Sequence, residues 1–170
     1  RIMPDGKLHV HSGCGNLGTY SYAATARAAA EALGGSWENM VIERGDSSKG
    51  LPFVLGQFGS NSTYTQTRTN WAAGMDAKAK LQEIAAKDLG GAPGDYDTSD
   101  GKVFNKANPS KSMSWAQAAK RAIELGGKYS GKEMPKDLNP ITKWATAGIA
   151  GTGLVGVTKD KRPKKGVTPG

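Results

Sequence analysis

The distribution of hydrophobic and polar positions along this chain predicts short strands that alternate with helices. Residues 7–12 alternate apolar with polar side chains, which is the period of a half-buried strand. Residues 20–33 are dominated by alanine and are followed by a glycine pair, which predicts a close-packed helix. The apolar residues 40–42 predict a second strand, and residues 47–60, rich in glycine and serine, predict a long loop.

The next part of the pattern has helical spacing. Within residues 62–89, apolar side chains form a stripe at helical spacing and predict a long helix that a glycine pair ends. Residues 95–98 and 102–105 predict two short strands around a Ser-Asp-Gly turn. Ser114 is expected to cap a further helix over residues 115–125.

Beyond residue 128 no regular period is visible. Residues 148–156 combine glycines with small apolar residues, so we expect extended structure or a loop whose surface another segment covers. The pattern predicts an α+β fold, with a mixed sheet and two to three helices, that forms part of a larger subunit. Residues 1–127 are assigned to the α+β region, and residues 128–170 to a glycine-rich and basic extension that packs on other segments.

The chain carries a formal net charge of +8, and the excess of basic residues lies near its C-terminal end. A basic domain favours a phosphate-bearing partner, so a module that binds nucleic acid or a membrane surface is one alternative. A solvated tail or a linker is the simpler interpretation, and we favour it over nucleic-acid binding. The basic cluster comprises Lys159, Lys161, Arg162, Lys164 and Lys165.

Other residue types narrow the function only slightly. No stretch of about 20 apolar residues predicts a membrane-spanning helix. The single cysteine, Cys14, excludes an internal disulfide and leaves a cytoplasmic and a periplasmic location both open. His9 and His11 share one face of a strand, but no third ligand has suitable spacing, so we expect no metal site. Catalytic residues remain unassigned, because no pair of carboxylates stands out for acid–base chemistry.

The sharpest local motif is Gly-x-Gly-x-x-Gly at residues 13–18, between a predicted strand and a predicted helix. With Glu43 on the following strand, it matches the fingerprint of a Rossmann-type NAD(P)-binding domain, which we keep as an alternative. Its first strand, however, carries Lys7, His9 and His11, with no obvious acid to pair with all three. The Pro-Asp-Gly turn before this strand also suits an antiparallel hairpin, so we predict that the motif does not bind NAD.

A series of short motifs has the order and spacing of a known family. A strand opens with Asp-Gly-Lys, a Ser-Gly turn and a glycine-rich loop follow, and the next helix ends in Ala-Ala-Glu-x-Leu-Gly. A Trp-Glu pair then precedes a strand that ends in Gly-Asp, a proline loop and a Gly-Ser-x-x-Thr turn. Over residues 5 to about 125, the chain thus resembles the molybdopterin-binding subunit of molybdenum hydroxylases, the family of xanthine dehydrogenase and aldehyde oxidase. The motifs are residues 5–7, 12–13, 15–20, 29–34, 37–38, 45–47, 51–52, 59–63, 85–86 and 100–104, followed by the helix that Ser114 leads.

The resemblance implies a segment of the second cofactor-binding region of an oxidoreductase subunit. It implies molybdopterin as the cofactor, alone or as molybdopterin cytosine dinucleotide, with iron–sulfur clusters on a partner domain or subunit. The family hydroxylates a carbon centre of an aldehyde or N-heterocycle, so a small organic substrate and other segments or subunits of the oxidoreductase are the implied partners. The family's catalytic glutamate lies in a Gly-Glu motif, which this sequence lacks.

The resemblance also indicates where the cofactor binds. Molybdopterin is a polyanion that needs backbone N–H groups at helix starts and short hydroxyls, and two turns before predicted helices offer both. Each turn taken alone could equally be an ordinary helix cap. Thr19 and Tyr20 stand where the family usually has Gln and Gly, and that Gln contacts the cofactor. The candidate residues are Gly18, Thr19, Tyr20, Ser21, Gly59, Ser60, Asn61, Ser62 and Thr63.

Overall fold

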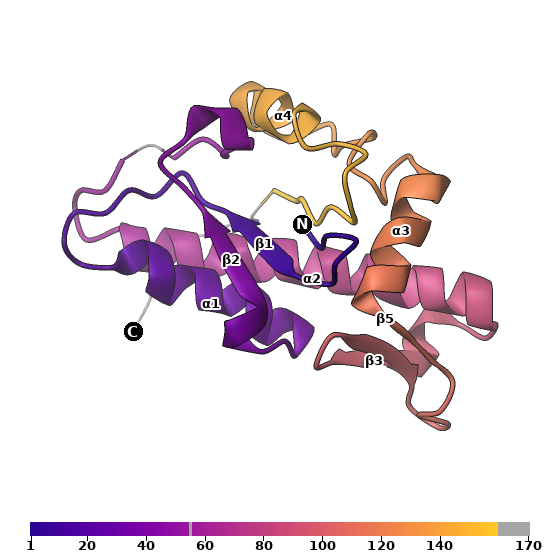
Figure 1. Ribbon diagram of the computed structural model, residues 1–170. Coiled ribbons are helices and arrows are strands. Elements are labelled where there is room, and N and C mark those ends of the chain that lie inside the picture. Colours follow the sequence, from indigo (N-terminus) through magenta and orange to yellow (C-terminus); the bar gives the residue numbers. More distant parts are fainter. Residues whose placement is uncertain (55, 160–170) are drawn as a thin grey trace, which may run out of the picture.

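The computed structural model describes residues 1–54 and 56–159, and its elements follow the predicted order (Figure 1). Most of the basic cluster of the sequence analysis lies outside the described residues. The strands are β1 (Leu8–His11), β2 (Met40–Glu43), β3 (Tyr96–Ser99), β4 (Lys102–Asn105) and β5 (Ser112–Ser114). The α-helices are α1 (Ser21–Leu33), α2 (Ser62–Leu89), α3 (Trp115–Leu125) and α4 (Pro140–Ala147), and short 3₁₀ helices are η1 (Trp37–Asn39), η2 (Ser47–Lys49) and η3 (Pro93–Asp95).

Strands β1 and β2 form a two-stranded parallel sheet, and α1 is the crossover between them. Leu8 lies opposite Met40 in the register of this sheet. The expectation of an antiparallel hairpin at β1 was therefore wrong for its pairing with β2. The turn at residues 4–6 does fold the chain back, but it makes only a single antiparallel bridge, from Ile2 to Leu8. The other edge of β1 pairs with β2.

Helix α2 is the longest element, and α1 packs along it in the same direction (Figure 1). Asn70 Nδ2 donates a hydrogen bond to the Thr25 carbonyl at 3.0 Å, and one turn further Gly74 lies against Ala29 and Ala32. A Cβ at Gly74 would be 2.8 Å from the Ala32 Cβ, so glycine permits this close approach. Both predicted helices are confirmed.

The three-stranded antiparallel sheet, in the order β3-β4-β5, lies beside the C-terminal half of α2 (Figure 1). Gln82 of α2 donates to the Tyr96 carbonyl at 2.7 Å, and the side chain of Tyr96 is fully buried. The sequence did not predict β5, because its three residues, Ser-Met-Ser, are too few to show a period. The α+β class is confirmed, although one parallel and one antiparallel sheet replace the expected single mixed sheet.

Helix α4 was not predicted, and residues 128–170 were expected to be irregular. Its N-cap is Asn139, whose Oδ1 accepts a hydrogen bond from the Ile141 N–H at 2.8 Å, and Pro140 occupies the first helical position. This Asn-Pro pair was the sequence signal for a helix start. Of the helices in the described part of the chain, none is long and apolar enough to cross a membrane.

Residues 148–156 were expected to be covered by another segment, and the covering segments belong to this chain. Leu154 is fully buried and forms an antiparallel bridge with Ile2. From α2, Lys80 Nζ donates to a backbone carbonyl of the same stretch at 2.7 Å. This glycine-rich stretch is therefore part of the core described here. The division of the chain after residue 127 stays a prediction.

Candidate cofactor-binding site

The parallel packing of α1 and α2 brings both helix starts to the same end of the molecule (Figure 1). The contact between Thr25 and Asn70 lies near both starts, because α1 begins at Ser21 and α2 at Ser62. Strand β1 also runs toward this end, since its loop leads directly into α1. The first N–H groups of a helix lack partners within the helix and carry a partial positive charge. Two such starts side by side make a surface suited to an anion.

The loop before α1 leaves that helix start open. Gly18 and Tyr20 have φ values of 84° and 52°, so the chain enters α1 through left-handed conformations. No side chain caps the helix, and the N–H groups of Ser21 and Tyr22 donate no hydrogen bond within the described residues. The side chains of Thr19 and Tyr20 are exposed. The predicted residues of this loop thus surround free backbone donors.

The loop before α2 has the same character. Gly59 and Ser60 have φ values of 61° and 54°, and Gly59 has open space where a Cβ would lie. Asn61 occupies the cap position, but its Oδ1 accepts a hydrogen bond from Thr65 Oγ1 at 2.7 Å and caps no backbone N–H. Thr63 is exposed in the first turn. Each predicted loop therefore leads into a helix whose first turn has no side-chain cap.

Gln57 connects the two loops. Its Nε2 donates to Ser21 Oγ at 2.9 Å, and Ser21 is buried. The Ser21 hydroxyl therefore serves the contact between loops, and only its backbone N–H remains for a ligand. The sequence analysis did not single out Gln57, because a lone glutamine in a glycine-rich loop has no diagnostic spacing. It lies beside the loop in which Thr19 replaces the family's usual glutamine.

The electrostatic surroundings favour an anion at both helix starts. The Arg44 guanidinium lies 3.9 Å from the ring centroid of Tyr22 in the first turn of α1. Arg68 Nη1 donates to the Tyr64 hydroxyl of α2 at 2.7 Å. Neither helix has an acidic residue in its first turn. Each start thus combines free N–H groups with a nearby arginine, which fits a phosphate-bearing group. Nothing in the sequence indicated that these arginines lie at the helix starts, because the position of each guanidinium depends on the aromatic ring on which it stacks.

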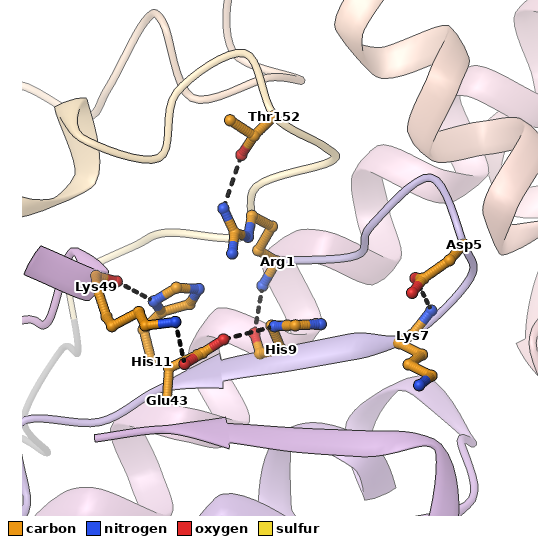
Figure 2. Close-up of polar contacts among 8 residues, drawn as sticks. All are labelled: Arg1, Asp5, Lys7, His9, His11, Glu43, Lys49 and Thr152. Carbon is orange, nitrogen blue, oxygen red and sulfur yellow. Dashed lines mark hydrogen bonds and ion pairs between the residues drawn. The ribbon is translucent and has the colours of Figure 1, made fainter. Parts of the chain in front are cut away.

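Glu43 is engaged at the carboxyl ends of the parallel strands (Figure 2). Its Oε1 lies 2.9 Å from His9 Nδ1, and its Oε2 lies 3.7 Å from Lys49 Nζ. Burial raises the pKa of Glu43, but the hydrogen bond from His9 and the charge of Lys49 outweigh burial and hold the pKa below its usual value. No acid was expected to pair with all of Lys7, His9 and His11, and Glu43 pairs with His9. A carboxylate held in this way is not free to bind a ribose, as the Rossmann alternative requires.

An α+β domain with two open helix starts at one end, each beside an arginine, has the architecture of a domain that binds an anionic cofactor. The comparison with protein families specifies the cofactor. The model of the molybdopterin cofactor-binding domain matches residues 1–159, so the chain belongs to this family. The predicted family is confirmed, and the NAD(P)-binding and nucleic-acid-binding alternatives find no support.

Individual relatives agree with this assignment. The aldehyde oxidoreductase molybdenum-binding subunit PaoC of Escherichia coli O157:H7 is 34% identical over 104 residues, which are 61% of this chain and 13% of that subunit. The same subunit from strain K12 is 35% identical over 104 residues, again 61% of this chain and 13% of that subunit. This chain thus spans about one eighth of the curated relatives it matches, so their complete activity does not follow from the match alone.

Solved structures show the same fold. A Cu,Mo-CO dehydrogenase in its carbon monoxide reduced state has a TM-score of 0.61 at 30% identity, over 72% of this chain and 15% of that chain. Reconstituted CO dehydrogenase from Oligotropha carboxidovorans has a TM-score of 0.62 at 28% identity, over 82% of this chain and 16% of that chain. Quinoline 2-oxidoreductase from Pseudomonas putida 86 has a TM-score of 0.60 at 21% identity, over 82% and 17%, and shows the fold alone.

Proposed function

We propose that this chain forms part of a molybdenum-dependent oxidoreductase subunit, in which the starts of α1 and α2 bind the phosphate-bearing side of molybdopterin. The observation that carries the proposal is the pair of parallel helices whose uncapped starts lie at one end. Family membership supports molybdopterin as the cofactor. The nine candidate residues lie in the two loops before these helices and in the first turns of the helices.

The residues at this end fit the cofactor in charge and in hydrogen-bonding capacity. The free N–H groups of Ser21 and Tyr22 can donate to phosphate oxygens, and the Arg44 guanidinium, stacked on the Tyr22 ring, adds a positive charge at this helix start. The exposed hydroxyls of Ser60 and Thr63 can donate at the start of α2. When bound, molybdopterin would carry the molybdenum that serves as the redox centre, and the protein would contribute binding and orientation.

The form of the cofactor is the finer part of the proposal. Two helix starts, one of them beside Arg44, offer more anion-binding capacity than one phosphate requires. A diphosphate would engage both starts, which favours molybdopterin cytosine dinucleotide over molybdopterin with its single phosphate. We further propose that the whole protein oxidises an aldehyde or an N-heterocycle, and that its iron–sulfur clusters lie on a partner domain or subunit. The relationship to an aldehyde oxidoreductase subunit supports this substrate class.

Removal of two hydroxyls at the start of α2 tests the proposal. Ser60 has a φ of 54°, where a β-branched residue would be strained, so the informative double variant is Ser60→Ala with Thr63→Val. Loss of two hydrogen bonds of about 1 kcal/mol each should weaken molybdopterin binding roughly tenfold or more. Molybdenum and pterin per chain are measured after native purification, and nucleotide released by acid identifies the form of the cofactor.

A matched variant, Ser110→Ala with Thr158→Val, removes two exposed hydroxyls that lie outside both candidate loops. It should keep full occupancy and the same thermal midpoint. If the test variant and this control hold equal amounts of molybdopterin at equal stability, the α2 start does not bind the cofactor through these hydroxyls. Release of no nucleotide from a fully loaded protein would refute the dinucleotide form alone.

A further inference from the structure

Large apolar side chains are exposed around the open starts of α1 and α2. Leu17 and Tyr20 lie in the loop before α1 and are 66% and 63% exposed, and Phe58 in the loop before α2 is 62% exposed. Tyr64, in the first turn of α2, is 42% exposed. The end of the molecule that offers backbone donors to an anion therefore also offers aromatic rings. A ligand that has both a phosphate and a planar ring would use both features.

Tyr20 has a backbone conformation that favours glycine. Its φ is 52°, in the left-handed region, where a residue with an aromatic side chain is strained. Glycine, which the family usually has at this position, would adopt this φ without strain. The Tyr20 ring is mostly exposed, so its packing within the described residues does little to offset the strain. The ring therefore contributes little to the stability of the chain, and its position favours a role in binding.

The Tyr20 ring is supported on one side by Tyr22. The two ring centroids are 6.2 Å apart and the planes are tilted by 46°, which is within the range of favourable aromatic pairs. The Arg44 guanidinium, 3.9 Å from the Tyr22 centroid, extends this row of stacked groups. Among the described residues, no cation and no second ring contacts Tyr20. Its exposed surface therefore remains available for a further planar group.

The ring and the free donors belong to consecutive residues. The N–H groups of Ser21 and Tyr22 have no partner within the described residues, and the first turn of α1 has no acidic residue. A nucleotide matches this arrangement, because a single sugar separates its phosphate from its planar base. An apolar protein segment would cover the ring but leave the donors unpaired.

We propose that Tyr20 is the stacking surface for the nucleobase of the dinucleotide cofactor, whose phosphates bind at the helix starts. The inference rests on the proposed function and adds to it the residue that holds the base. Stacking on an aromatic side chain is a common way to hold a base, since every base has a flat π face.

Cytidine monophosphate and ribose 5-phosphate differ in the base, so the ratio of their dissociation constants measures the contribution of the base. Titration of the full chain, followed by nuclear magnetic resonance, gives both constants. Stacking should make cytidine monophosphate bind about fivefold more tightly, which is equivalent to about 1 kcal/mol. In Tyr20→Leu, which keeps an apolar side chain and removes the ring, the ratio should fall below about twofold.

Phe58→Leu is the matched control, because Phe58 is equally exposed and lies in the other loop. Its ring lies against its own backbone, since a Cβ added at Gly56 would be 2.6 Å from Phe58 Cε1. The control should therefore keep the ratio of the unaltered chain. An equal fall of the ratio in both variants would overturn the assignment of the base to Tyr20.

A second readout uses the unaltered chain, so it does not depend on the folding of a variant. The ring current of a stacked tyrosine should move the cytosine proton resonances upfield at saturation, and Tyr20→Leu should remove most of this shift. Unshifted cytosine resonances would overturn the inference, and so would equal affinities for two ligands that both bind saturably, while the proposed function would stand. If neither ligand bound saturably, the phosphate site at the start of α1 would be refuted, and the inference with it.

Discussion

The four α-helices of the described chain start in two different ways. At α3, Ser114 Oγ accepts from the Gln117 N–H at 3.1 Å while Gln117 Oε1 accepts from the Ser114 N–H at 2.8 Å, which closes the helix start from both sides. At α4, Asn139 caps the first turn. At α1 and α2, no side chain caps the start, and left-handed residues lead into each helix. The caps of α3 and α4 stabilise the fold, whereas the starts of α1 and α2 leave backbone donors available for the proposed cofactor.

The difference is instructive because all four helices belong to one small domain. Open helix starts carry a cost in stability, since capping contributes about 1 kcal/mol per helix. The chain uses good caps where α3 and α4 begin and omits them where two starts meet at one end. Caps missing for no functional reason would be expected at unrelated helix starts. The two uncapped starts are instead neighbours. Their proximity supports the proposal that these donors bind the cofactor.

The largest expected effect comes from the contact that holds the open starts together. In Gly74→Val, the new side chain meets Ala32 and the Ala29 carbonyl, whose nearest atoms lie 2.8 and 2.9 Å from an added Cβ. We expect a loss of about 3 kcal/mol in the free energy of unfolding, because overpacking a close helix contact is costly. Molybdopterin occupancy should fall as well, since the helix starts separate. Urea denaturation and metal analysis measure the two effects.

Gly94→Val is the matched control for this prediction. Gly94 has no atom within 4 Å of an added Cβ, so the same substitution should change the stability by less than about 0.5 kcal/mol. Occupancy should stay at the level of the unaltered chain. Equal destabilisation by the two substitutions would show that the packing of α1 on α2 is not what the glycine at position 74 protects.

Acid should loosen the open end of the molecule before the capped end. Burial lowers the pKa of His11 to about 4, below its ordinary value of 6.5, so the folded chain binds fewer protons than the unfolded chain between these values. The contribution of His11 is complete above pH 6.5 and is lost as the pH falls from 6.5 to 4, by about 3 kcal/mol. His11 anchors the Lys49 carbonyl, at the start of the segment that leads to α2.

Hydrogen exchange at pH 7 and pH 4.5, corrected for intrinsic rates, checks this prediction. Protection should decrease in residues 44–54 and be retained in α3, which has no histidine near its cap. A His11→Gln variant, which cannot titrate in this range, should lose much less protection between the two pH values. A uniform loss across both regions would instead indicate general acid denaturation.

The smallest expected effect is the difference in stability between removing a capping side chain at α3 and removing the residue at the cap position of α2. Ser114→Ala removes a two-sided cap and should cost about 1 kcal/mol without changing cofactor occupancy. Asn61→Ala removes the residue at the cap position of α2, which caps no N–H, and should cost less than about 0.5 kcal/mol. Thermal unfolding of both variants without cofactor provides the measurement. A larger loss from Asn61→Ala would mean that α2 is capped in solution after all.

Much of the fold could be predicted because the conformation of a single helix depends mainly on local sequence signals, such as helix propensity and capping residues. The alanine run of α1 and the Ser114 cap of α3 are examples, and both helices lie within a residue or two of the prediction. The parallel pairing of β1 with β2 is the one that the Rossmann alternative implied, and the polar residues of the first strand and the turn before it led us to expect a hairpin instead. The helix α4 was missed although Asn139 and Pro140 signal its start, because its eight residues are too few to show a clear period.

The candidate site was predictable only in outline. The glycines and hydroxyl residues of the two loops are visible in the sequence, and whether they contact the cofactor stays a prediction. The contact of Gln57 with Ser21, 36 residues apart, follows from the crossing of two loops that no local pattern encodes. The roles of Arg44 and Arg68 depend in the same way on which aromatic ring each one meets.

The side-by-side, same-direction packing of α1 and α2 has a consequence for how the protein survives without its cofactor. Two helix dipoles with like ends together repel each other, and the contact through Gly74 holds them close. A bound polyanion would attract both positive helix starts and so offset their repulsion. At a free concentration of about 1,000 times Kd, it would stabilise the fold by about 4 kcal/mol. An unloaded chain should therefore be degraded faster than a loaded one. A cell short of cofactor would then lose the protein itself, so that abundance follows cofactor supply without a dedicated regulator.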